Sequence, residues 1–273
     1  MLLTDTQLEA FRTDGFVAIP SAFSADEVAA LNARLPVLFE EGCPENIRER
    51  SSGVVRTALG LHRRDPLFGE LVRDPRFVGP ARQILGEVPG DDAFYVQQVK
   101  VNAKEAFTGE QWQWHYDFAT HHHFDGVPEP LALNLHIFLD EVTEFNGPLV
   151  FIPGSHRHGP APTSLDTTTT SYPLWTVPND AVTLLAADRG LVSPKGPAGT
   201  MLIFGDALVH GSPGNLSPWG RRIFSLIVNP VRNRQRTFAR ADHLHHSDFA
   251  PVEMRAGSFR DSLVYAPYLG DGP

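Results

Sequence analysis

The feature that most restricts the fold of this chain is a series of short strand-like segments that begins near residue 94. The segments "FYVQQVKVN", "WQWHYDF", "LALNLHIFL", "PLVFIP", "TMLIF" and "RIFSLIVN" are apolar or alternating, and Gly, Pro and Asn lie between them. Many short strands at such spacing are typical of antiparallel two-sheet folds. The pattern therefore predicts a β sandwich or a jelly roll.

The first ninety residues have a different pattern, which favours helices. Thr4-x-x-Gln7 and Ser24-x-x-Glu27 fit the capping box, and apolar residues follow each at helical spacing. Between them "GFVAIPSAF" predicts a short strand, and "DPLFGELVRDPRFVGPARQIL" predicts one or two helices broken at Pro75 and Pro80. We expect one domain over residues 1–273, made of a helix-rich support (1–90), a jelly-roll core (91–235) and a C-terminal tail segment (236–273). The threonine-rich tract 163–173 predicts a mobile loop.

Composition excludes several classes of partner. The net charge of -9 and the absence of any Lys/Arg-rich run argue against nucleic acid, and no apolar stretch approaches the ~18 residues of a membrane span. The acidic charge favours a small-molecule substrate. A single cysteine, Cys43, cannot form an internal disulfide, which fits the reducing cytoplasm, so we expect a cytoplasmic location. Cys43 has no neighbouring His, which argues against a nucleophilic role. The sequence sets no oligomeric state.

The segment "WQWHYDF" alternates strictly. A period of two places Trp112, Trp114, Tyr116 and Phe118 on one strand face, and Gln113, His115 and Asp117 on the other. Two potential metal ligands then point the same way. A half-buried strand with its polar side in solvent would show the same pattern, so the segment alone decides nothing.

Of the twelve histidines, His210 has the position most typical of a ligand or catalytic residue. It closes the apolar run "TMLIFGDALVH" just before the turn "GSPGN", where a strand end can present a ligand. The run His121 to His123 predicts a polar loop near the mouth of a site rather than a second metal site. We expect His243, His245 and His246, in a polar tail, to lie at the surface.

Together, His115, Asp117 and His210 have the composition of the facial triad of non-haem Fe(II) oxygenases. Such a triad leaves three metal positions open, two for a bidentate 2-oxo acid and one for O₂. Arg221 or Arg222 begins the next strand, and adjacent antiparallel strands would bring a guanidinium near the metal to hold the far carboxylate. A Zn²⁺ hydrolase would not need this arginine. That class and a jelly-roll binding protein without catalysis remain as alternatives.

Four blocks of the sequence resemble the phytanoyl-CoA dioxygenase family of Fe(II)/2-oxoglutarate oxygenases, and within it the bacterial hydroxylases of ectoine, free proline and free leucine. These blocks are "QQVKVNAK", "WHYDF", "EFNGPLVFIPGSH" and "GPAGTMLIFGDALVHGSPGNLSPWGRR", and the likeness runs from about residue 5 to 235. It implies a double-stranded β-helix, a cupin-like jelly roll backed by N-terminal helices. It also implies Fe(II) as cofactor, with 2-oxoglutarate and O₂ as co-substrates.

The resemblance also implies roles for individual residues. It places the iron ligands at His115, Asp117 and His210 and the 2-oxoglutarate carboxylate at Arg221, and leaves Arg222 structural. Gln98 and Asn134 match positions near 2-oxoglutarate, and Lys100 matches one near substrate. His121 stands where the hydroxylases have Trp, so it makes the substrate wall polar and titratable.

The expected reaction is hydroxylation of an unactivated C–H bond. Halogenating relatives resemble one another in having Gly or Ala in place of the carboxylate, whereas Asp117 is present here. We expect the substrate to be a free amino acid or a related small carboxylate, with a larger terpenoid or acyl compound as the alternative. Desaturation, epimerisation and ring closure share the same cofactor chemistry, and the sequence does not separate them.

Overall fold

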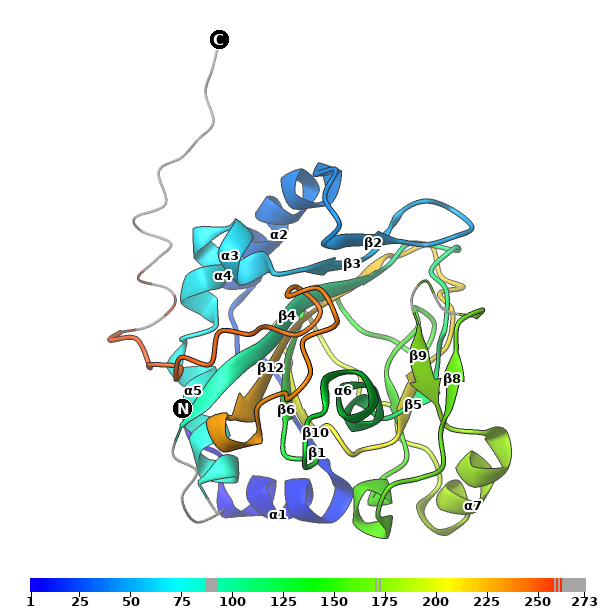
Figure 1. Ribbon diagram of the computed structural model, residues 1–273. Coiled ribbons are helices and arrows are strands. Elements are labelled where there is room, and N and C mark those ends of the chain that lie inside the picture. The colour runs from blue at the N-terminus through cyan, green and yellow to red at the C-terminus, as the bar shows by residue number, and fades with distance from the viewer. Residues whose placement is uncertain (87–92, 170, 172, 258, 260, 262–273) are drawn as a thin grey trace.

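Two antiparallel sheets form the centre of the molecule (Figure 1). The computed structural model describes residues 1–86, 93–169, 171, 173–257, 259 and 261. The larger sheet has the strand order β1-β10-β6-β12-β4-β3-β2, and the smaller has the order β7-β11-β5-β9-β8. Strands far apart in sequence are neighbours in both sheets, as in a jelly roll, so the predicted fold class is confirmed.

The strands are β1 Phe16–Ile19, β2 Asn46–Arg48, β3 Val55–Leu59, β4 Phe94–Lys104, β5 Trp112–His115, β6 Leu133–Phe138, β7 Val150–Phe151, β8 Ser164–Asp166, β9 Leu174–Thr176, β10 Met201–Gly205, β11 His210–Ser212 and β12 Arg221–Pro230. The α-helices are α1 Asp5–Asp14, α2 Ala25–Glu40, α3 Leu61–Arg64, α4 Pro66–Leu71, α5 Pro75–Leu85, α6 Asp117–Asp125 and α7 Asn179–Arg189. Short 3₁₀ turns cover Ser155–His158 and Val231–Asn233.

The helix starts follow local sequence chemistry. Thr4 and Ser24 both form the predicted capping boxes, with Gln7 and Glu27 bonding back to the cap. Pro75 begins α5 as expected, because a proline costs no hydrogen bond in the first turn. The break predicted at Pro80 is wrong. Pro80 lies within α5, whose buried apolar face packs into the core and holds the helix through the proline.

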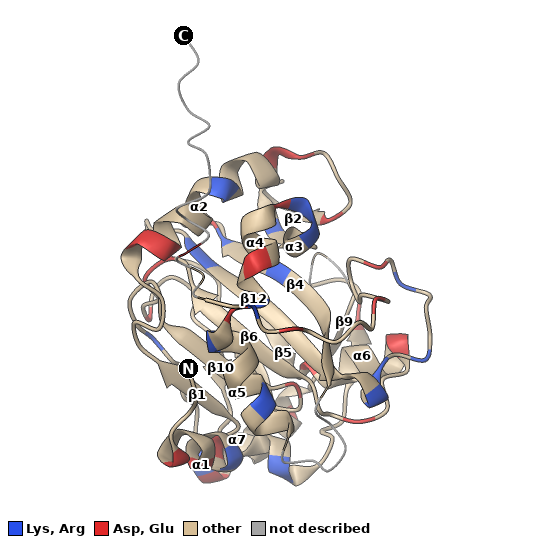
Figure 2. Ribbon diagram, turned by 90° about the vertical axis from the view of Figure 1, so that its left-hand side faces the viewer, with Lys and Arg blue, Asp and Glu red and all other residues tan. Residues whose placement is uncertain are grey.

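The main core lies between the larger sheet and helices α2 to α5, which pack on its outer face (Figure 1). Asp and Glu are absent from the strands of the larger sheet, whose Lys and Arg residues are confined to β2, β3, β4 and β12 (Figure 2). Burying this apolar layer provides most of the driving force for the fold. Within the described part of the chain, no helix is long and apolar enough to cross a membrane.

The N-terminal region also supplies strands. β1 pairs with β10, and β2 and β3 extend the larger sheet beyond β4, so residues before 90 form part of the jelly roll itself. In the threonine-rich tract, Ser164–Asp166 forms β8 paired with β9 rather than a loop, while residues 170 and 172 lie outside the described set.

Candidate active site

A cavity opens between the two sheets, and three predicted ligands meet in it. His115 ends β5, Asp117 begins α6 and His210 begins β11, where it pairs directly with His115. His115 Nε2 lies 3.7 Å from Asp117 Oδ1, and the two imidazole rings have centroids 4.2 Å apart. One ligand atom from each residue lies within 4.8 Å of the others, which is close enough for one ion.

Backbone and amide groups orient these three side chains. His115 Nδ1 lies 2.6 Å from the Gln113 carbonyl oxygen and His210 Nδ1 lies 2.9 Å from that of Leu208. A carbonyl accepts only from a protonated nitrogen, so in the neutral form of each ring Nε2 keeps a lone pair. Asn134 Nδ2 donates to Asp117 Oδ2 at 2.9 Å and leaves Oδ1 available. Imidazoles fixed through Nδ1–H and a bonded carboxylate are what a divalent metal site requires.

Burial and neighbouring groups set the charge states of His115 and Asp117. It lowers the pKa of His115 to about 3, helped by the neighbouring His210, so His115 is neutral at neutral pH. Burial alone would raise the pKa of Asp117. The nearby His210 and Lys100 outweigh that effect and hold its pKa well below the usual range. A neutral imidazole nitrogen beside a hard anionic oxygen fits Fe(II) chemistry.

The local structure differs from the predicted strand. Strand β5 ends at His115, and Asp117 is the first residue of α6, where a carboxylate suits the positive end of the helix. His210 pairs with His115 while Ser212 pairs with Trp112, so the register shifts between the two pairs. This bulge breaks the alternation, and Trp112 lines the cavity together with His115 instead of facing away.

Arg221 lies at one end of the cavity, only 2% exposed. It starts β12 in the larger sheet, so the predicted adjacency of its strand to that of His210 is wrong, because β11 belongs to the other sheet. Its Nη2 donates to the Gly147 carbonyl at 2.7 Å and to Ser212 Oγ at 3.3 Å. Among the described residues no carboxylate pairs with it, and burial lowers its pKa to about 10.

Arg222 lies outside the cavity and serves structure, as the sequence suggested. It forms a bidentate pair with Asp140, with distances of 2.6 and 2.8 Å. In the motif "EFNGP", the Asn146 side chain bonds the backbone of Glu141 and Thr143, while Gly147 adopts a positive φ of 73° and offers its carbonyl to Arg221. This motif therefore shapes a turn that places Arg221.

The other predicted residues line the cavity on two strands and a helix. Gln98, Lys100 and Asn102 come from β4, Asn134 from β6 and His121 from α6. Lys100 makes no hydrogen bond or ion pair with a described residue, and burial lowers its pKa. The run His121 to His123 is helical rather than a loop, because α6 continues to Asp125 before Gly126 ends it with a positive φ.

Sequence reasoning missed the wall that closes the other end of the cavity. The C-terminal segment, defined here as residues 236–249, contributes Arg240 and Leu244 to the lining. The prediction that His245 and His246 lie at the surface is wrong, because they are 2% and 1% exposed. This segment has no regular structure, so periodicity gives no signal for it. His136 was also missed, although it is polar on an apolar strand two residues from Asn134.

Comparison with known proteins gives consistent matches. The family model described as phytanoyl-CoA dioxygenase (PhyH) matches residues 11–223. An ectoine dioxygenase of Bordetella bronchiseptica is 35% identical over 85% of this chain and 77% of its own. An L-proline trans-4-hydroxylase of Streptomyces griseoviridis is 36% identical over 88% and 91%. The crystal structure of EctD from S. alaskensis with 2-oxoglutarate and 5-hydroxyectoine superposes with a TM-score of 0.82, at 32% identity over 94% and 89%.

Proposed function

Because the chain belongs to the phytanoyl-CoA dioxygenase family, as a non-haem Fe(II)- and 2-oxoglutarate-dependent dioxygenase, we propose that it hydroxylates a free amino acid or a related small carboxylate. The observation that carries this proposal is a cavity with a three-ligand centre in its middle and cationic groups on both sides of it. Such a cavity suits two carboxylate-bearing molecules bound next to one metal ion.

The residues that would hold Fe(II) are His115, Asp117 and His210. Their orientation supports this, since hydrogen bonds to carbonyl oxygens and to Asn134 leave one donor atom of each residue directed to a common point. When bound, the metal with 2-oxoglutarate and O₂ supplies the oxidation of a C–H bond. The protein contributes binding, orientation and the exclusion of water.

Arg221 would bind the far carboxylate of 2-oxoglutarate. It is a buried cation at the cavity end with no carboxylate partner among the described residues, and its Nε is unsatisfied. A planar guanidinium held by Gly147 and Ser212 presents its remaining N–H groups in a geometry that suits a carboxylate. Asn134 would act through the metal centre by fixing Asp117, and in the sheet it lies level with Gln98 across Ile227 of β12.

The substrate would occupy the opposite end, between β4, α6 and the C-terminal segment. Lys100 offers a cation for a substrate carboxylate, and His121 forms part of the wall. We assign Gln98 to the substrate rather than to 2-oxoglutarate, because its Nε2 donates to the Leu244 carbonyl at 2.7 Å and so ties it to the C-terminal segment. The amino-acid and ectoine substrates named for the relatives carry a carboxylate of this kind.

The first test is an oxygen-free absorption titration. Fe(II) and then 2-oxoglutarate are added to the apo-protein, in wild type and in the His210→Ala variant. We expect a weak charge-transfer band in the visible range that requires both additions and is lost in the variant. Tight Zn²⁺ binding without this band would contradict the Fe(II) assignment.

The second test concerns the substrate. Free amino acids, ectoine, terpenoids and acyl thioesters are compared by the succinate they release from 2-oxoglutarate, and product mass identifies hydroxylation. We expect stimulation by a free amino acid or small carboxylate. Stimulation only by a terpenoid or an acyl thioester would contradict the proposed substrate class while leaving the cofactor chemistry in place. A cytoplasmic location remains our expectation from the single Cys43.

A further inference from the structure

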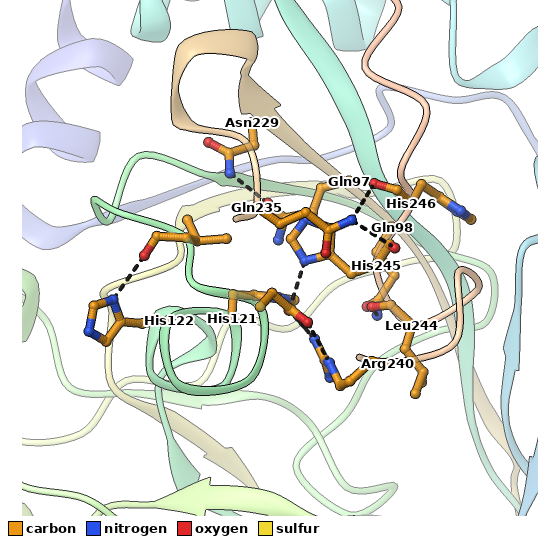
Figure 3. Close-up of polar contacts among 12 residues, drawn as sticks. Gln97, Gln98, His121, His122, Asn229, Gln235, Arg240, Leu244, His245 and His246 are labelled. Atoms are coloured by element: carbon orange, nitrogen blue, oxygen red, sulfur yellow. Dashed lines mark hydrogen bonds and ion pairs between the residues drawn. The ribbon is translucent and has the colours of Figure 1, made fainter. Parts of the chain in front are cut away.

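A second buried polar cluster lies directly behind the substrate end of the cavity. It consists of His121 and Asp125 on α6 and of Arg240 and His245 on the C-terminal segment (Figure 3). Asp125 is fully buried, and the two histidines are 5% and 2% exposed. So much buried polarity is costly unless it is fully bonded, so each contact in the cluster matters.

Asp125 is the centre of this cluster. Arg240 Nε donates to Oδ1 at 2.8 Å, Arg240 Nη2 donates to Oδ2, and His245 Nδ1 lies 2.8 Å from Oδ2. The Asp125 carbonyl also accepts from the backbone N–H groups of Arg236 and Thr237. Burial alone would raise the pKa of Asp125, but the bonds from His121, His245 and Arg240 hold it well below its usual range.

The composition of two histidines and one carboxylate resembles a metal site, but the contacts argue against one. The Arg240 guanidinium bonds both oxygens of Asp125 and so occupies the place a cation would take. A metal ion would have to displace a half-buried arginine that has no second carboxylate nearby in the cluster. The cluster is instead a charge-paired support for the cavity wall. Two of its members, His121 and Arg240, border the cavity.

The contacts of His121 fix which ring nitrogen faces the cavity. Nδ1 lies 3.2 Å from Asp125 Oδ2 and 3.3 Å from Arg240 Nη2. The carboxylate is a charged acceptor, whereas Arg240 Nη2 already donates to that carboxylate, so the proton belongs on Nδ1. Nε2 makes no hydrogen bond with a described residue. Burial lowers the pKa of His121 to about 4, which keeps the ring neutral at neutral pH.

Two other polar atoms of the cavity wall, Gln98 Oε1 and Thr120 Oγ1, also lack a hydrogen-bond partner. Because Gln98 Nε2 donates to the Leu244 carbonyl, the amide is oriented and its Oε1 is left as a buried acceptor without a bond. Thr120 Oγ1 is also buried and unbonded, and both residues line the cavity. Gln98 Oε1 can only accept, so a ligand that satisfies it has to bring an N–H or O–H donor, whereas the Thr120 hydroxyl can donate or accept.

We propose that Asp125, supported by Arg240 and His245, is a positioning residue that fixes His121 as the Nδ1–H tautomer, so that His121 Nε2 and Gln98 Oε1 together accept from an ammonium group of the substrate. This inference rests on the proposed function and narrows it to substrates with a primary or secondary ammonium. A substrate whose nitrogen is fully alkylated, or replaced by an ether oxygen, has no proton for these acceptors.

The first experiment measures the tautomer and needs no ligand. In ¹⁵N-labelled protein at neutral pH, the His121 ring signals are assigned by their loss in the His121→Gln variant. We expect Nδ1 to carry the proton and Nε2 to have the shift of an unprotonated ring nitrogen. A protonated Nε2 would overturn the inference whatever the substrate is. Asp125→Asn, whose amide can donate to Nδ1, should move the proton to Nε2.

The second experiment measures binding by calorimetry, without oxygen, to protein loaded with Fe(II) and 2-oxoglutarate. The probes are L-proline, N,N-dimethyl-L-proline and tetrahydrofuran-2-carboxylate, which share a carboxylate and differ at the nitrogen. We expect L-proline to bind about tenfold or more tightly than the other two, the usual value of a hydrogen bond to a charged group. Equal binding of all three would overturn the inference. Binding of none, together with no amino acid active in succinate release, would contradict the proposed substrate and leave the tautomer measurement to decide on His121.

Two substitutions at His121 separate recognition from structure. Asn can keep the bond to Asp125 but does not reach the Nε2 position, whereas Gln places an amide oxygen near it. We expect His121→Asn to raise KM for L-proline about tenfold with little change in kcat, and His121→Gln to restore most of the affinity. The control is His122→Asn, because His122 is exposed on the same helix, bonds the Val127 carbonyl and does not line the cavity. Equal losses in His121→Asn and His121→Gln would show a structural role and refute recognition.

Discussion

Replacing Arg221 by Met should weaken 2-oxoglutarate binding strongly but change the stability of the ligand-free protein little. For stability, the cost of burying the charge offsets the hydrogen bonds that the arginine makes, whereas the bound carboxylate depends on that charge. The pKa of Arg221 is lowered from 12.5 to about 10 by burial, which corresponds to about 3 kcal/mol against the charged form in the folded chain. The variant removes that cost and loses two hydrogen bonds, to Gly147 and Ser212, worth about 1 kcal/mol each. The free energy of unfolding of the ligand-free variant should therefore lie within about 1 kcal/mol of wild type.

The affinity for 2-oxoglutarate should fall sharply in the same variant. A bidentate bond between arginine and a carboxylate is worth about 3 kcal/mol, or roughly a hundredfold in Kd. At a concentration near 100 times the wild-type Kd, 2-oxoglutarate stabilises wild type by about 2.7 kcal/mol and the variant by about 0.4 kcal/mol. The expected rise in Tm is about 5–10 °C for wild type and about 1 °C for the variant.

The assay is thermal unfolding without oxygen, with Fe(II) present, across a 2-oxoglutarate titration. Arg222→Met is the matched control, since Arg222 pairs with Asp140 outside the cavity. This control should lose stability but keep the full rise in Tm. The reasoning is refuted if Arg221→Met keeps the wild-type rise, or if the control loses it.

Three further predictions follow from contacts elsewhere in the structure. Asn134→Ala removes the donor to Asp117 and should weaken metal binding about 10- to 100-fold, measured by competition with a chelator; unchanged affinity would contradict its orienting role. Arg76→Ala leaves the buried carboxylate of Glu27 without its partner and should cost about 3–5 kcal/mol in urea unfolding, against little change for the exposed Arg73→Ala. Burial and the nearby His246 lower the pKa of His62 from 6.5 to about 3. As the pH falls, His62 is therefore protonated in the unfolded chain before it is protonated in the folded one. Stability should be full above about pH 6.5 and fall towards pH 3, and His62→Phe should flatten this dependence in urea unfolding at pH 7 and pH 5.

The sequence predicts local features of this fold well where side-chain chemistry acts within a few residues. The capping residues Thr4 and Ser24 begin helices as expected, because their bonds are local and need no tertiary partner. Pro80 was mispredicted for the opposite reason: packing of α5 on the sheet, a long-range effect, keeps the helix intact. Whether a segment forms a strand can likewise be predicted from local residue patterns. The assignment of β11 and β12 to different sheets depends instead on the topology of the whole chain.

The candidate site shows the same division. Its three ligands could be chosen from residue type and spacing. The predicted continuous strand that would place His115 and Asp117 on one face was wrong, because a bulge interrupts β5 and α6 begins at Asp117. Arg240 and Leu244 could not be found, because they lie in an irregular segment whose position depends on Asp125 and Gln98. The burial of His245 follows from that same docking, and a polar composition gives no hint of it.

The two ends of the cavity are formed by parts of the chain that differ in how they are hydrogen-bonded to the sheets. Arg221 lies in the longest pairing of the larger sheet, where β12 matches β4 over nearly its whole length, whereas Arg240 and Leu244 lie past the last strand and no sheet bond depends on them. Substitutions at exposed positions of residues 236–249 should therefore leave the sheets and the metal ligands intact, whereas the buried His245 and His246 contact β4. Because this segment supplies Arg240 and Leu244 to the cavity wall, we expect that transplanting it between relatives, together with Asp125 and its neighbours on α6, would alter substrate choice.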